Sequence, residues 1–150
     1  MRGLALAALC LLGGCVTDAA TRRLTLEDEL LDADRAFARD VQERRLEGWL
    51  AAFDEHGSQV DEHGAPVTGR AAIRAYMQAA FDEPDFQLTW DPVEASIPEG
   101  GTLGFVWGHW TLGAPGAAQQ HGRYLDIWRK GPDGKWKLLF DVGEDAAPRR

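Results

Sequence analysis

Hydrophobic and polar positions alternate along the last third of the chain, in three runs that are rich in aromatic and β-branched residues. The runs cover residues 103–112, 121–130 and 135–142. Residues of these types fit a pleated surface that is buried on one side. The sequence Gly-Pro-Asp-Gly at 131–134 separates the last two runs and carries the Asp-Gly pair of a tight hairpin. The pattern therefore predicts successive antiparallel strands whose apolar side needs a cover.

A helical repeat near the start of the chain can supply that cover. Apolar side chains recur three or four positions apart between Leu26 and Val41, which predicts a helix over residues 26–45. Thr25 is a suitable N-cap, and the acidic residues after it suit the positive end of a helix dipole. The residues opposite the apolar stripe are charged, so we expect that side of the helix to face water.

Shorter elements fill the segment between this helix and the three runs. They are a short helix at 49–53, a hairpin of residues 58–62 and 65–67, a helix at 71–81, and a strand from Phe86 to Ile97. Pro92 interrupts that strand and predicts a bulge or bend, because proline cannot donate a hydrogen bond to a neighbouring strand. Helices that precede a run of strands indicate an α+β fold.

The charge balance excludes two classes of partner. The 150 residues carry a net charge of −8 at pH 7. Nucleic-acid phosphates and anionic lipid head groups bind clusters of Lys and Arg, so we expect neither on this acidic surface. Six Trp residues are many for one domain. Because a buried indole needs a partner for its N–H, such residues tend to line cores or pockets.

The N-terminus has the pattern of an export signal. A basic start at Arg2 precedes an apolar run at 4–12, which is too short to span a bilayer. Leu12-Gly-Gly-Cys15 resembles the lipobox of bacterial lipoproteins, whose cysteine is lipidated and becomes the new N-terminus. An ordinary cleaved signal with an incidental cysteine is the alternative. The resemblance implies a signal peptide at 1–14, a tether at 15–24 and a folded domain at 25–145.

The same resemblance implies a cellular location. A lipid on Cys15 would hold the domain at a bacterial membrane without any other membrane contact. Val16 resembles the pattern that directs lipoproteins to the outer membrane, which would leave the domain in the periplasm. Cys10 would depart with the signal, so the mature domain would hold no thiol, no disulfide and no cysteine-ligated metal. The four His residues lack metal-ligand spacing, and we expect neither a metal nor a cofactor.

Four stretches of the folded part resemble one known family. They are residues 34–53, Pro66-Val-Thr-Gly-Arg-Ala-Ala-Ile73, Gly122–Lys130, and Asp133–Leu138 with Asp141-Val-Gly143. In order and spacing they resemble the SnoaL-like domains known as DUF4440, within the NTF2-like superfamily. The resemblance implies a cone, in which a curved antiparallel sheet wraps around N-terminal helices and leaves a cavity, often in a homodimer formed through the outer sheet face. Relatives include ketosteroid isomerase, polyketide cyclases and limonene epoxide hydrolase, but also binding proteins without catalysis, so the family transfers no catalytic set.

Strand alternation selects candidate site residues. Trp107 and His109 share one face of the first run. Tyr124, Asp126 and Trp128 share one face of the second run. Our hypothesis directs both faces into the cavity. A carboxylate among indoles would be desolvated, and its pKa would rise toward that of a useful general base. His109 could exchange a proton near neutral pH, and Tyr124 could donate to an oxyanion.

The alternative is that Asp126 faces water and that the indoles belong to the core. We expect first of all a binding protein, in which Trp90, Trp107 and Trp128 contact a small hydrophobic or aromatic molecule. Cofactor-free lyase, isomerase or hydrolase chemistry at Asp126 and His109 is the second expectation. A dimeric interaction scaffold is the third.

Overall fold

The computed structural model describes residues 13–114 and 116–146, with side chains from Asp18 onward. The predicted signal peptide therefore lies outside the described residues except for the backbone of Gly13 and Gly14, and so does the side chain of Cys15. The helices are α1 (Gly13–Arg44), α2 (Leu46–Ala52) and α3 (Arg70–Asp82), and the strands are β1 (Phe53–Val60), β2 (Pro66–Thr68), β3 (Leu88–Ser96), β4 (Leu103–Leu112), β5 (Gln120–Lys130) and β6 (Trp136–Asp145).

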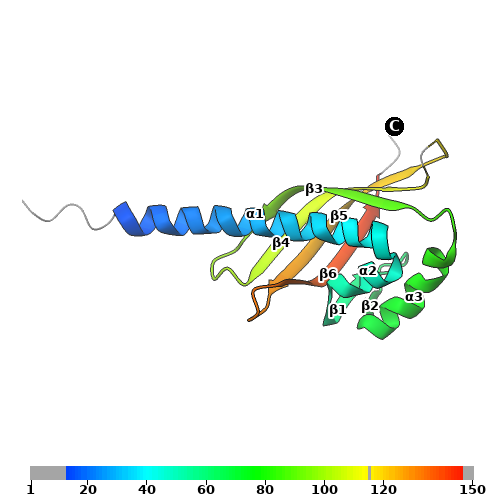
Figure 1. Ribbon diagram of the computed structural model, residues 1–150, viewed down its shortest axis with the longest axis horizontal. Coiled ribbons are helices and arrows are strands. Elements are labelled where there is room, and N and C mark those ends of the chain that lie inside the picture. Colours follow the sequence, from blue (N-terminus) through cyan, green and yellow to red (C-terminus); the bar gives the residue numbers. More distant parts are fainter. Residues whose placement is uncertain (1–12, 115, 147–150) are drawn as a thin grey trace, which may run out of the picture.

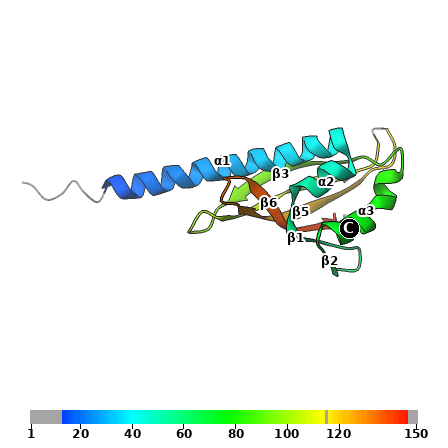
Figure 2. The ribbon, with the colours of Figure 1, turned by 60° about the horizontal axis from the view of Figure 1, so that its bottom comes forward.

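The strands of the described chain form one curved sheet in the order β2-β1-β6-β5-β4-β3. α1 runs across one face of this sheet, and α2 and α3 gather at one end of it (Figures 1 and 2). The predicted α+β fold, with a curved sheet around N-terminal helices, is confirmed. One pairing differs from the antiparallel prediction, because β1 runs parallel to β6.

The inner side of α1 supplies much of the core. Leu30, Asp34, Phe37 and Val41 follow each other at spacings of three and four, so they lie on one side of the helix and are buried against the sheet. Most of the stripe is apolar, as the sequence pattern predicts. Asp34 is the exception, since it is a carboxylic acid with no exposed surface.

α1 begins earlier than predicted. Its helical backbone covers the segment 15–24 that we expected to be a tether. Thr25 is not an N-cap, because its hydroxyl donates to the carbonyl oxygen of Thr21 within the helix at 3.0 Å. The physical reason is that residues 18–24 are mostly Ala, Arg and Leu, which favour helix, and contain neither Gly nor Pro to stop it.

The corner between α1 and α2 closes one end of the domain. Arg45 sits there with a φ of 54°. Its guanidinium donates to the carbonyl oxygens of Phe81 at 2.5 Å and Glu83 at 3.0 Å, which ties the corner to the end of α3. Gly48 lets α2 approach α1, since a Cβ there would lie 2.2 Å from the carbonyl oxygen of Asp40. The three helices are therefore tied together at this end of the sheet.

The strands agree with the sequence pattern in most places. The register between β3 and β4 shifts between Pro92 and Glu94, so the predicted bulge is confirmed. The small hairpin is confirmed as well, but β1 is longer than predicted. It begins at Phe53, a residue that the pattern placed in the short helix. Phe53 is fully buried, so its burial in the sheet overrides its helical spacing from Trp49.

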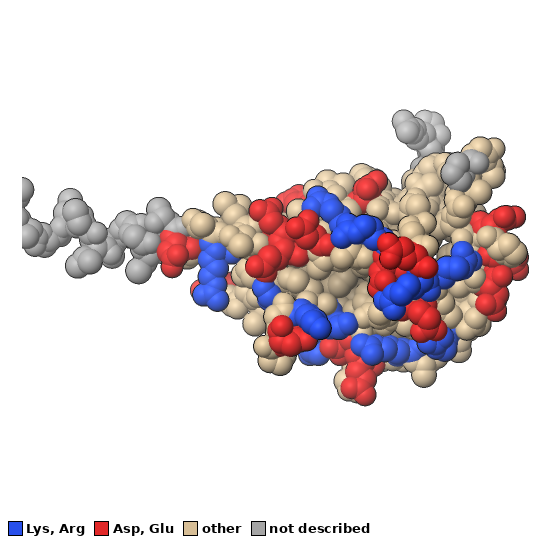
Figure 3. Space-filling model, in the orientation of Figure 1, with Lys and Arg blue, Asp and Glu red and all other residues tan. Residues whose placement is uncertain are grey.

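The outer face of the sheet keeps apolar groups in contact with solvent. Trp107 and Leu125 lie opposite each other there and are 38% and 42% exposed. The helical side differs, because Lys and Arg mix with Asp and Glu across the face shown in Figure 3. No helix within the described residues has the length and apolar character needed to cross a membrane.

Candidate functional site

A cavity of about 300 Å³ lies between the helices and the inner face of the sheet. Aromatic rings make up much of its wall. Phe37 contacts Trp90 edge to face with ring centroids 4.7 Å apart, and Trp49 contacts the same indole at 5.9 Å. Trp110 adds a third indole from β4. Rings that interlock in this way hold the wall in place and leave an apolar hollow at its centre.

A carboxyl group anchors two of these rings. Oδ1 of Asp34 on α1 accepts hydrogen bonds from the Tyr124 hydroxyl and from the Trp90 indole N–H, each at 3.0 Å. Burial raises the pKa of Asp34 to about 6, although the two hydrogen bonds act in the opposite direction. Near neutral pH this group therefore exchanges between its neutral and charged forms.

Two further carboxyls meet Asp34 at the inner face of the sheet. Asp126 on β5 lies opposite Asp141 on β6 and is only 2% exposed. Burial, followed by the charges of Asp141 and Asp34, raises the pKa of Asp126 well above its ordinary range. Burial raises the pKa of Asp141 to about 6, and this half-buried residue lines the cavity. The three groups interact, so they hold and release protons together.

No basic side chain among the described residues neutralises this cluster. Oδ1 of Asp126 and Oδ2 of Asp34 are buried and receive no hydrogen bond from any N–H or hydroxyl group of the described chain. Neighbouring carboxyls can satisfy such oxygens only by carrying a proton. The cluster therefore keeps protons at pH values where an exposed Asp has already lost its own.

Tyr124 remains a hydrogen-bond donor over the whole physiological range. Burial raises the pKa of its hydroxyl, and the charges of Asp34 and Asp126 raise it further. Gly108 lies opposite Tyr124 on β4, and a Cβ at that position would stand 2.6 Å from the tyrosine ring. The missing side chain therefore makes room for the ring to reach Asp34.

The structure brings only some of the predicted site residues together. Tyr124, Asp126 and Trp90 line the cavity. Trp107 and His109 do not line it, because they pair with Leu125 and Arg123, which are exposed on β5. Paired residues on antiparallel strands point to the same side of a sheet. The predicted placement of His109 and Trp107 at the cavity is therefore wrong.

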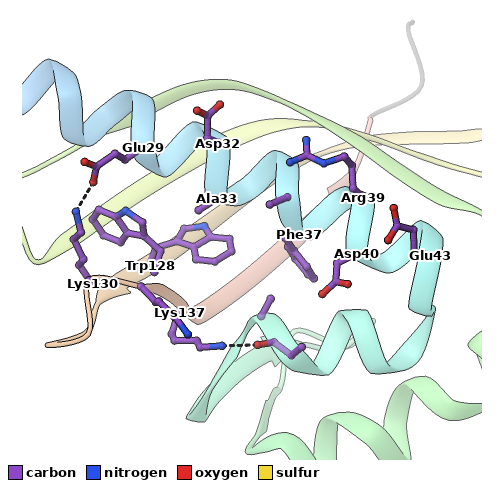
Figure 4. Close-up of a pocket in the computed structure, with 16 residues that line it drawn as sticks. Glu29, Asp32, Ala33, Phe37, Arg39, Asp40, Glu43, Trp128, Lys130 and Lys137 are labelled. Carbon is purple, nitrogen blue, oxygen red and sulfur yellow. Dashed lines mark hydrogen bonds and ion pairs between the residues drawn. The ribbon is translucent and has the colours of Figure 1, made fainter.

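Trp128 shares the inner face but lines a different hollow. This groove, about 940 Å³ in volume, runs between α1 and the turn that joins β5 to β6 (Figure 4). Its rim is charged and largely paired: Lys130 contacts Glu29, and Lys137 donates to the carbonyl oxygen of Ala51 at 2.7 Å. Trp128 therefore lines the groove and not the cavity, so the structure does not place it where we expected it to contact a ligand.

The carboxyl cluster does not have the arrangement of a metal site. Within the described residues, no group of three or more His, Cys, Asp or Glu side chains is placed to hold a metal ion. The arrangement can instead accept and give protons, place negative charge beside an apolar surface, and hold a tyrosine hydroxyl in a fixed direction.

Comparison with known proteins identifies the family. The sequence profile of the SnoaL-like domain (SnoaL_2) matches residues 34–139. The chain belongs to this family. The narrower DUF4440 assignment stays a prediction. No curated protein matches the chain significantly.

Solved structures resemble the SnoaL-like domain at low identity. A domain of unknown function with a cystatin-like fold from Nostoc punctiforme has a TM-score of 0.66 at 19% identity, covering 79% of this chain and 76% of its own. A ketosteroid isomerase-like protein from Erwinia carotovora atroseptica has a TM-score of 0.64 at 13% identity, with coverage of 78% and 93%. An NTF2-like superfamily protein from Salmonella enterica has a TM-score of 0.62 at 16% identity, covering 84% of this chain and 94% of its own. At these identities the likeness shows the fold alone.

Sequence reasoning missed two members of the carboxyl cluster. Asp34 had a usable signal, because it stands four residues after Leu30 and three before Phe37 on the apolar stripe of the helix. A carboxyl at such a position is either buried or a break in the stripe. Asp141 had no such signal in the sequence. A register shift between β5 and β6 reverses the inward and outward alternation of the β6 side chains just before this residue.

Proposed function

We propose that this SnoaL-like domain binds a small, largely apolar or aromatic molecule in the cavity. The volume of about 300 Å³ is at the lower end of the range for ligand pockets, which is roughly 300–1,000 Å³. Interiors of domains are otherwise packed to near crystal density, so a hollow of this size among large rings is a cost to folding. A bound molecule would recover that cost.

The observation that carries the proposal is the composition of the wall. Indoles from three elements surround the hollow, and buried carboxyls with a tyrosine lie at its base. Apolar surface with a few convergent polar groups is the usual make-up of a ligand site, in which the polar groups fix orientation. The groove lacks this make-up, because its charged rim is open to water.

Isothermal titration calorimetry with small aromatic probes tests the proposal. Met77 on α3 lines the cavity, whereas Ala79 on the same helix is exposed. Met77→Trp should fill the hollow and weaken binding by more than tenfold, and Ala79→Trp should leave the affinity unchanged. Equal affinities in both variants would place binding outside the cavity. Mass spectrometry of molecules extracted from protein purified out of its native host identifies the natural ligand.

General acid–base catalysis is a second candidate, favoured by the coupled carboxyls beside Tyr124. A group whose pKa lies near the working pH transfers protons efficiently, and such catalysis contributes about 10²–10⁴-fold to a rate. The class would be a cofactor-free lyase, isomerase or hydrolase, with Asp126 as the proton acceptor. Asp126→Asn should lower turnover of an unsaturated ketone or epoxide substrate at least about 10²-fold. Asp85→Asn, at an exposed position, is the matched control, and equal loss in both variants would remove the assignment.

A homodimer through the outer sheet face is also proposed. The exposed side chains of Trp107 and Leu125 support it, since apolar surface of this kind often marks an interface. Sedimentation equilibrium should show a dimer that Leu125→Glu converts to a monomer, while Arg35→Glu on the helical side has no effect. A wild-type monomer at high micromolar concentration would contradict the dimer.

The proposed location is the periplasmic side of the outer membrane, through a lipid on Cys15. The apolar run and the lipobox-like Leu12-Gly-Gly-Cys15 support it. In a Gram-negative host fed an alkyne fatty acid, the full chain should acquire the label, Cys10→Ala should keep it, and Cys15→Ala should lose it. Label retained in Cys15→Ala would show that the anchor is elsewhere.

A further inference from the structure

The cavity wall has acidic groups and no basic ones. Among its lining residues, Asp61 and Glu62 stand at the rim and Asp126 and Asp141 lie deep, while Lys, Arg and His are absent from the described wall. Backbone N–H groups, chiefly that of Ala65, lower the pKa of Asp61. The Tyr76 hydroxyl, at 2.5 Å, lowers the pKa of Glu62. Both rim groups are therefore charged at neutral pH, and a ligand that enters passes two negative charges.

The N–H and hydroxyl groups of the tryptophan and tyrosine side chains in the wall already donate hydrogen bonds to other groups of the protein. The indole N–H of Trp49 donates to Gln59 at 2.9 Å, that of Trp90 to Asp34 at 3.0 Å, and that of Trp110 to the carbonyl oxygen of Arg123 at 3.1 Å. The hydroxyls of Tyr76 and Tyr124 donate to Glu62 and Asp34. What the rings offer a ligand is their π faces, which carry partial negative charge.

Asp126 lines the hollow and is 2% exposed, and its buried Oδ1 receives no N–H or hydroxyl hydrogen bond in the described chain. An anion would meet like charge here and find few donors. A neutral acceptor would find the same shortage of donors. A cation would meet carboxyl oxygens and aromatic faces together, and both attract it.

We propose that the cavity selects a small organic cation, with its ammonium group at the Asp126–Asp141 carboxyls and its apolar substituents against the indole faces. This inference rests on the binding function proposed above and names the class of ligand. A bare metal ion is a poorer fit, because the described acidic groups are not placed to coordinate one. Ring faces instead suit the diffuse charge of an alkylated ammonium group.

Binding is coupled to proton release. The groups that face the Asp126 carboxyl are Asp34 from α1, Tyr124 on its own strand and Asp141 from β6, with Asp61 and Glu62 farther out at the rim. A cation beside the carboxyls favours their charged forms, so the proton that they share leaves as the ligand enters. By linkage, the affinity for a permanently charged cation rises with pH, up to about tenfold per pH unit for one displaced proton.

The test compares choline with 3,3-dimethylbutan-1-ol, which has the same shape but carbon in place of the ammonium nitrogen. Calorimetry of the full chain at pH 7 should give at least tenfold tighter binding of choline, and benzyltrimethylammonium should bind tighter still, since it fills more of the hollow. Titration in two buffers of different ionisation enthalpy should show a proton released. Phenylacetate should not bind.

Variants separate the possible outcomes. Asp126→Asn and Asp141→Asn should each lower the affinity for choline more than tenfold and abolish proton release, with no change for the neutral alcohol. Asp85→Asn should match wild type. Trp110→Leu removes a ring face without touching the carboxyls and should weaken choline selectively. Unfolding curves confirm that each variant is folded.

Equal binding of choline and its neutral isostere would overturn the cation inference and leave the proposed binding function intact. Failure of every cation and every neutral aromatic probe to bind would overturn both. Binding of the cations that neither carboxyl variant changes would place them outside the cavity and also overturn the inference.

Discussion

Phe37 on α1 lines both the cavity and the groove, but the charged groups of the two hollows lie in opposite environments. In the groove, charged groups stay at the rim and find partners, as Lys130 does with Glu29. Beside the cavity, burial shields Asp34, Asp126 and Asp141 from water, and these carboxyls have no basic partner in the described chain. The groove is the larger hollow, but the cavity is the one with unusual chemistry.

This difference separates what stabilises the fold from what opposes it. Exposed ion pairs contribute little, with a typical value of about 0–1 kcal/mol. Unpaired buried carboxyls cost several kcal/mol if they are charged, and so they take up protons instead. An arrangement that the fold maintains against its own stability is a better guide to function than the size of a hollow.

The largest effect is expected from the wall of the cavity. Trp49→Ala removes a buried indole that contacts Phe37, Phe53 and Phe81, and it should lower the free energy of unfolding by about 3–5 kcal/mol. Lys135→Ala, at an exposed position in the groove, should change it by no more than about 0.5 kcal/mol. Urea denaturation measures both. Similar losses would mean that the two hollows are equally part of the core.

The second effect is a decrease in the free energy of unfolding as the pH rises, which we expect from the carboxyl cluster beside the cavity and not from the groove. The pKa values of Asp34 and Asp141 rise from 3.8 to about 6 on folding, so the folded state binds more protons between these values. Stability is therefore fully present below about pH 4 and is lost as the pH rises through about 6, with Asp126 extending the loss upward.

Asp126→Asn should make the free energy of unfolding depend less steeply on pH, because the amide stays neutral and can donate to the neighbouring carboxyls. Denaturation should show a gain in the free energy of unfolding at pH 8 and almost none at pH 4. Asp32→Asn, at the exposed rim of the groove, is the control and should leave the slope as it is. A slope that Asp126→Asn leaves unchanged would assign the pH dependence to other groups.

The third effect concerns the two tyrosine hydroxyls of the cavity. Tyr124→Phe removes a buried donor to Asp34 and should cost about 1–3 kcal/mol, because an oxygen of that carboxyl loses a partner. Tyr76→Phe removes the corresponding bond to exposed Glu62, where water can replace it, and should cost about 0.5 kcal/mol or less. Thermal unfolding of the pair at pH 7 measures the difference. Equal costs would argue against a special role for the buried cluster.

The smallest effect is expected at the rim of the groove. Lys130→Met removes the ion pair with Glu29 and a cation–π contact with Trp136 at 5.6 Å, but it keeps most of the apolar stem. The loss should be about 0–1 kcal/mol and should shrink further in high salt. A salt-independent loss above 2 kcal/mol would show that the groove, too, depends on buried charge.

The sequence predicts faces within a strand better than it predicts how strands align. Alternation correctly grouped Tyr124 with Asp126, and Trp107 with His109. It could not say that His109 would pair with Arg123, because that register depends on the geometry of the loop between β4 and β5. A shift of one residue in that register would have turned His109 inward.

A bulge in β6 makes simple alternation a wrong guide to the face on which its later side chains lie. Ile127 pairs with Phe140 but Trp128 pairs with Leu138, so Leu139 is an extra residue in the strand. Simple alternation puts Asp141 on the side opposite Trp136 and Leu138, whereas the bulge returns it to theirs. The order and type of the elements are local properties and could be predicted, but the carboxyl cluster depends on these long-range alignments.

The parallel pairing of β1 with β6 has a consequence for how the chain reaches its native state. It joins Phe53 to Leu138 and Gln59 to Asp141, so this pairing of an early strand can form only once the last strand is present. Contacts between such distant residues slow folding, because a long loop must close first. A nascent chain can form its helices and the small hairpin during synthesis, but β1 can join the rest of the sheet only when β6 has been made.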